Sequence, residues 1–185
     1  MTFYFEFDEA DAFATGAIGN PGERTFYLQV RAEGRTISVK CEKAQVAQMA
    51  EYLRGMLSDL PEPRQAPSIE IARLQGPVEQ DFVLGTIGLG MDRATSRMVV
   101  QLEEAVMVDL DDIDLDEIGT DDLDAVEALL EEQEENASVV RVVLDPAQAR
   151  AFCEVADAVV GAGRPVCRWC GGPVDASGHA CPKMN

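Results

Sequence analysis

The chain has 185 residues, of which 46% are hydrophobic and 26% charged, so it is long enough for one globular domain with a small appendage. Its formal net charge of −19 disfavours binding to nucleic acid and to anionic membrane surfaces, because both need clustered Lys and Arg. No apolar run reaches the roughly 18 residues of a membrane-spanning helix, and no basic region opens the chain, so we expect a cytoplasmic protein without membrane contact.

The first 60 residues alternate in hydrophobicity and then change to a helical period. Phe3, Phe5 and Phe7 are separated by polar residues, which is typical of a strand. After three such stretches, apolar residues follow at helical spacing from Val46 to Leu57. We expect, in chain order, strands at 3–7, 12–18, 24–32 and 35–41, and a helix near 43–59.

A linker with three prolines, 60–67, leads to a second series of the same kind. Its helix should begin at Asp145-Pro146, since Asp can cap a helix and Pro suits the first turn. We expect a short strand at 69–74, strands near 81–90, 95–106 and 138–144, and a helix near 147–161. The alternation in 95–106 fits best with a one-residue shift or bulge.

Repeated residues indicate an internal duplication. Phe13-x-x-Gly16-x-Ile18-Gly19 recurs as Phe82-x-x-Gly85-x-Ile87-Gly88 at an offset of 69, and the helical stripes match at an offset of 103. We therefore predict an α+β fold of two β-β-β-α halves, about 1–60 and 69–162. The halves would share one core about a pseudo-two-fold axis.

Most of the negative charge lies in one segment, 103–136. Between Glu103 and Glu135 there are 16 acidic residues and no Lys or Arg. The rest of the chain contains the other 18 acidic residues and all 15 basic ones, so it is nearly neutral. We interpret the segment as a solvated insertion in the second half. Docking of a basic protein partner stays open, whereas the Asp112-x-Asp114-x-Asp116 run departs from a calcium loop at its sixth and twelfth positions.

The C-terminal segment 163–185 carries a metal-ligand pattern. Cys167, Cys170, His179 and Cys181 follow the spacing C-x2-C-x8-H-x-C, and tetrahedral Zn²⁺ takes such Cys and His ligands. We predict a structural zinc knuckle, because four protein ligands leave no open position. A redox dithiol is the alternative interpretation of C-x-x-C alone.

Other candidate residues have weaker assignments. Cys41 and Cys153 are expected to be buried small hydrophobes, since both fall on inward positions. Trp169 could stack on a nucleic acid base, but we favour packing of the knuckle against the α+β body, residues 1–162. Arg24 and Arg93 recur at the offset of 69, so they could form a paired anion site or pair with surface carboxylates.

Several segments resemble the bacterial family called domain of unknown function 3090, of actinobacterial type. They are Gly16 to Gln29 (GAIGNPGERTFYLQ), Asp145 to Phe152 (DPAQARAF), Ala162 to Pro165 and the C-x-x-C…G-H-x-C-P tail. The resemblance spans nearly the whole chain. It implies a cytoplasmic protein whose biochemical function is unknown.

No catalytic constellation is evident, because the single histidine is assigned to zinc. The function we infer is a non-enzymatic, zinc-containing binding or adaptor protein with a protein partner. The alternative is an enzyme or small-ligand-binding protein with a polar pocket between the halves. Nucleic-acid binding through the knuckle is a third, less favoured interpretation.

Overall fold

The computed structural model describes residues 2–61, 68–106, 136–163, 167–172, 174 and 178–184. Within them, the stretches of alternating hydrophobicity form strands, with the exception of 69–74, and the two stretches of helical period form helices. The elements are β1 (Tyr4–Phe7), β2 (Ala12–Ile18), β3 (Thr25–Ala32), β4 (Arg35–Cys41), α1 (Lys43–Ser58), η1 (Ile69–Ala72), β5 (Phe82–Asp92), β6 (Arg97–Glu104), β7 (Val139–Leu144) and α3 (Pro146–Gly161).

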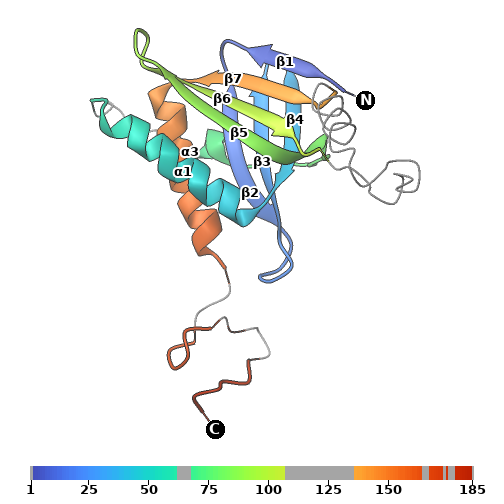
Figure 1. Cartoon of the computed structure of the whole chain (residues 1–185), viewed down its shortest axis with the longest axis vertical. Coiled ribbons are helices and arrows are strands. Elements are labelled where there is room, and N and C mark those ends of the chain that lie inside the picture. The colour runs from blue at the N-terminus through green and yellow to red at the C-terminus, as the bar shows by residue number, and fades with distance from the viewer. Residues whose placement is uncertain are drawn as a thin grey trace, which may run out of the picture.

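The strands form one seven-stranded sheet in the order β1-β7-β6-β5-β4-β3-β2. Neighbours within each half are antiparallel, whereas β4 pairs with β5, and β1 with β7, in parallel. Figure 1 shows α1 and α3 crossing on one side of this sheet. The predicted α+β class is therefore confirmed.

The sheet is strongly curled, which brings its edge strand β1 across to strands that are not its neighbours. The ring of Phe3, just before β1, lies 5.8 Å from that of Phe82 in β5. The Arg35 guanidinium of β4 lies 5.0 Å from the centre of the Phe5 ring. One hydrophobic core therefore joins both edges of the sheet to the helices.

Two segments of the second half differ from what the sequence predicts. The predicted strand at 69–74 is wrong: residues Ile69–Ala72 form a 3-10 helix, followed by an isolated parallel bridge between Thr15 and Arg73. The expected shift or bulge is not found within β6, which pairs with β7 in unbroken register from Met98 to Glu103. An irregularity lies instead in β5, between Leu84 and Ile87. Met98, Val100 and Leu102 alternate along β6 and have no exposed surface.

The two helices begin in the same way and each reaches into the other half. Gln45 accepts from the N–H of Glu42 at 2.8 Å, and Gln148 from that of Asp145 at 2.9 Å, again at an offset of 103. The Gln45 amide donates to Leu84 O (3.3 Å). Its counterpart Gln148 donates to Ala10 O, just before β2 (2.6 Å). Each capping glutamine thus ties a helix to the other half.

Residues at an offset of 103 also meet where α1 and α3 pack together. The Cys153 thiol lies 3.4 Å from Ala50 O, and Arg54 forms an ion pair with Asp157. Contacts between equivalent positions are expected where similar halves pack about a two-fold axis. The duplication and the division into 1–162 and 163–185 stay predictions, and these contacts favour the first of them.

A buried polar network holds the segment that connects the halves. Gln29, with no exposed surface, donates to Gln75 O (3.0 Å) and accepts from Gln75 N (3.0 Å). Arg31 donates to Gln29 Oε1 (3.2 Å) and to Ile71 O (2.7 Å). Because buried polar groups need partners, this network fixes residues 71–75 against β3.

We expect Gln29→Ala to lower the free energy of unfolding by about 2–4 kcal/mol, because it leaves backbone groups of Gln75 without their partner. Gln101→Ala is the matched control, since the Gln101 amide bonds only to Glu103 of its own strand in the part of the chain described. Its cost should stay below about 1 kcal/mol. Urea unfolding of both variants measures this, and equal losses would contradict the role of the network.

None of the helices in the described residues has the length and apolar character needed to cross a membrane.

Candidate metal centre

The first two ligand residues lie on a tight turn closed by backbone hydrogen bonds. The N–H of Gly171 donates to Cys167 O (2.8 Å), and the N–H of Cys167 donates to Gly172 O (2.7 Å). Gly171 has a φ of +75°, which a residue with a Cβ adopts only with strain. The glycine after C-x-x-C therefore has a backbone role in presenting both sulfurs on one side.

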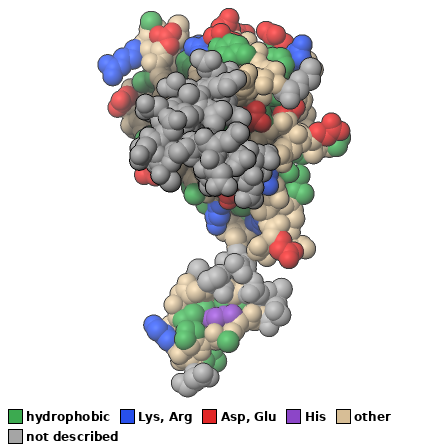
Figure 2. All heavy atoms as spheres, turned by 45° about the vertical axis from the view of Figure 1, so that its right-hand side comes forward, with side chains coloured by type: hydrophobic (Ala, Val, Ile, Leu, Met, Phe, Trp, Pro, Cys, Tyr) green, Lys and Arg blue, Asp and Glu red, His purple; other side chains and the backbone are tan. Residues whose placement is uncertain are grey.

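The structure brings the four predicted ligand residues together. One ligand atom from each of Cys167, Cys170, His179 and Cys181 lies within 4.8 Å of all the others. In Figure 2 the histidine side chain (purple) lies within the C-terminal segment, beside green side chains, the colour given to hydrophobic residues and to cysteine. The C-x-x-C pair and the H-x-C pair, whose members are 9 to 14 positions apart in sequence, thus converge on one point.

Two of the distances between ligand atoms are close to those of a tetrahedral metal site. The sulfurs of Cys167 and Cys181 are 3.8 Å apart, and Cys170 Sγ lies 3.2 Å from His179 Nε2. Metal–ligand bonds of the zinc type give tetrahedron edges of about 3.8 Å between sulfurs and about 3.5 Å between sulfur and nitrogen. A disulfide would need about 2.05 Å, and the cysteines are free. The cluster could therefore hold a metal ion.

Backbone N–H groups of the turn lie close to two of the cysteine sulfurs, and such contacts favour the thiolate form. Trp169 N lies 3.4 Å from Cys167 Sγ, and Gly172 N lies 3.4 Å from Cys170 Sγ. N–H groups of Cys170 and Trp169 hold the pKa of the Cys167 thiol below its usual value, whereas desolvation raises the pKa of Cys181. A metal ion at this point would favour the thiolate form of all the cysteines.

The structure does not show Trp169 packed against the body. The Trp169 side chain is 53% exposed, and the Arg168 guanidinium lies over its ring, 5.2 Å from the ring centre. Packing of Trp169 against the body is therefore a wrong prediction. The ring instead lies on the surface of the C-terminal segment, flanked by a positive charge.

The two arginines at the offset of 69 are not brought together. Arg24 lines a hollow beside β2 and α3, whereas Arg93 lines a different one with Asp59 and Leu60. Arg73, which the sequence did not single out, shares the hollow with Arg24. No local signal marks Arg73, because its position depends on the tertiary packing of residues 69–78, the segment that connects the halves.

The remaining cysteines behave as predicted. Cys41 and Cys153 are each 4% exposed within the core. Burial raises the pKa of Cys41 to about 12 and that of Cys153 to about 11, so both thiols stay protonated near neutral pH. They are therefore separate from the C-terminal cluster in both position and chemistry.

The acidic segment is described only at its edges. Residues 107–135 lie outside the described part of the chain, so the predicted insertion, its helix and its calcium-like run are not tested by the structure.

The fold and the cluster together define an α+β protein with a C-terminal Cys3His group that could bind a metal ion. The family model described as "Protein of unknown function (DUF3090)" matches residues 5–181, so the chain belongs to that family. The family resemblance of the sequence is thereby confirmed. No curated protein and no solved structure shows a significant match to the chain.

Proposed function

We propose that the Cys3His cluster holds one structural zinc ion and that the protein acts as a non-enzymatic binding or adaptor protein. The observation that carries the zinc assignment is the convergence of four ligand atoms within 4.8 Å. Three thiolates and one imidazole suit Zn²⁺ better than oxygen-preferring cations. A complete set of four protein ligands leaves no position for substrate, which supports a structural role.

The adaptor role is supported by what the turn presents to solvent. Trp169 sits between two zinc ligands and is 53% exposed, with Arg168 against its ring. Exposed Trp and Arg are the residue types most enriched at the energetic centres of protein interfaces. A folded zinc turn would hold this pair rigidly, so binding would cost little conformational entropy.

The partner we propose is another protein. The acidic segment 103–136 favours a partner with a basic surface, since complementary charge steers association. The experiment is co-purification of the tagged full chain from its native host, with Trp169→Ala compared to wild type. Tyr52→Ala is the matched control, because Tyr52 is an exposed aromatic residue (66%) on α1 of the body.

We expect a specific protein partner that is lost with Trp169→Ala and kept with Tyr52→Ala, at equal zinc content. A partner retained by Trp169→Ala would contradict the proposed surface. Salt-sensitive binding of single-stranded nucleic acid that Trp169→Ala abolishes would instead replace the adaptor proposal with nucleic-acid binding.

A further inference from the structure

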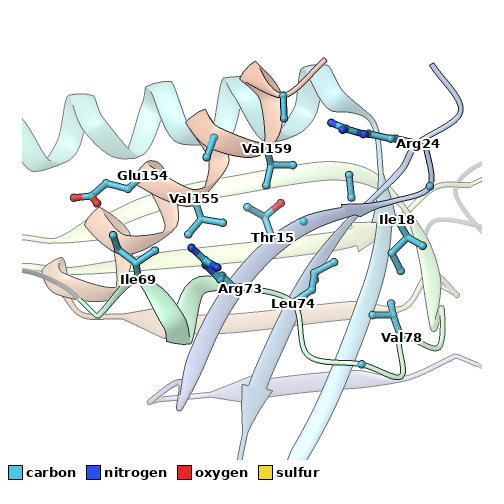
Figure 3. Close-up of a pocket in the computed structure, with 16 residues that line it drawn as sticks. Thr15, Ile18, Arg24, Ile69, Arg73, Leu74, Val78, Glu154, Val155 and Val159 are labelled. Atoms are coloured by element: carbon cyan, nitrogen blue, oxygen red, sulfur yellow. The ribbon is translucent and has the colours of Figure 1, made fainter. Parts of the chain in front are cut away.

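A hollow of about 740 Å³ lies where the first half meets the second. Its sides come from β2, from the connecting segment 69–78 and from α3 (Figure 3). Its volume is within the roughly 300–1,000 Å³ of pockets that bind small molecules. The hollow is therefore large enough for a ligand of that size.

The walls are mostly aliphatic, and they are held in place by close packing and by hydrogen bonds of the connecting segment. Ile18, Leu74, Val78, Val155 and Val159 line it. A Cβ on Gly16 would lie 2.7 Å from Leu74 Cγ, so the glycine is what allows the connecting segment to lie so close to β2. Together with the Gln29–Gln75 hydrogen bonds, this close packing makes the hollow a preformed feature.

The charges in the hollow are unevenly placed. Arg24 is half-buried, and no ion pair among the described residues involves it. Figure 3 places the Glu154 carboxylate at the opposite end of the hollow, pointing away from Arg24. Arg73 lies between them and has a carboxylate at 3.7 Å, that of Glu70. One end of an aliphatic hollow thus carries a positive charge that its described surroundings do not neutralise.

We propose that this hollow binds a small amphipathic anion, a function separate from that of the metal centre. The aliphatic or aromatic body of the ligand would lie against Leu74, Val155 and Val159. Its single anionic group would accept charge-assisted hydrogen bonds from Arg24, which presents several donors in a fixed plane. Apolar walls with few polar groups are the usual design of such sites.

The test uses two fluorescent probes that differ only in the anionic group. They are 8-anilinonaphthalene-1-sulfonate and its uncharged counterpart N-phenyl-1-naphthylamine, titrated into the full, zinc-loaded chain. We expect saturable binding of both at one site. Arg24→Ala should raise the Kd of the sulfonate probe by about tenfold or more. The Kd of the uncharged probe should stay within about twofold of its wild-type value.

Two further variants make the result specific. Arg93→Ala removes the arginine at the matching offset, in a different hollow, and should leave both probes unaffected. Ala158→Trp fills the hollow from an exposed position of α3 and should abolish both. Binding that survives Ala158→Trp, equal weakening of both probes by Arg24→Ala, or no saturable binding would overturn the proposal. Zinc content, measured in every variant, reports separately on the metal centre.

Discussion

Phe152→Ala is expected to lower the free energy of unfolding by about 3–5 kcal/mol, because Phe152 is one of the two largest fully buried side chains, together with Phe13. The Phe152 ring of α3 has no exposed surface and lies 4.8 Å from the Phe13 ring of β2. Losing it would remove the burial of the ring and leave a cavity between the helix layer and the sheet. Urea unfolding followed by circular dichroism measures the loss.

A double-mutant cycle with Phe13→Ala tests whether the two rings act together. We expect a coupling free energy of about 0.5–1.5 kcal/mol, as for other tilted aromatic pairs. If Phe152→Ala does not fold, the cycle is run with leucine at both positions, where smaller losses of about 1–2 kcal/mol are expected. Strictly additive losses would show that the contact between the rings contributes nothing of its own.

Removal of the proposed zinc ion with a chelator is expected to unfold the C-terminal segment, 163–185, and leave the body folded. Among the described residues of this segment only Cys167 and Cys181 are buried. We therefore expect metal binding to supply the free energy that orders the segment, which is about 10–16 kcal/mol in zinc-finger peptides. Trp169 is the only tryptophan in the chain, and its fluorescence reports on this segment alone. Its emission should change on chelation, while thermal melting of the sheet and helices should not.

Cys153→Ala is the matched control for this experiment. Its thiol lies in the core beside Ala50, far from the ligand set, and the variant should respond to chelator as the wild type does. Re-addition of Zn²⁺ should restore the original emission in both proteins. Trp169 emission that does not change on chelation would contradict this prediction. So would a lowered melting temperature of the sheet and helices after chelation.

Local patterns predicted most of the secondary structure. The alternation of strand residues and the capping pair Asp145 and Gln148 are encoded within a few residues, so α3 starts one residue from its expected position. The clustering of the four Cys and His side chains was predictable for the same reason, because C-x2-C-x8-H-x-C is a local spacing. The chain's only histidine made the assignment more specific.

Features that depend on distant contacts could not be predicted in this way. The Ile69-Glu70-Ile71 alternation is typical of a strand, yet Arg31 bonds the Ile71 carbonyl, and the residues form a 3-10 helix. The parallel pairing of β4 with β5, and the curl that brings Phe3 to Phe82, leave no local signal. The same holds for the hollow that joins Arg24 to the connecting segment, since its walls come from three separate stretches of chain.

Elemental analysis of the full chain, purified without chelator, tests most directly the proposal that Cys167, Cys170, His179 and Cys181 hold one zinc ion. We predict one zinc per chain in wild type and in Cys153→Ala, and less than about a tenth of that in Cys167→Ser, because loss of one ligand from a closed site sharply lowers affinity. Wild-type protein without metal, or a full equivalent of zinc in Cys167→Ser, would contradict the zinc assignment.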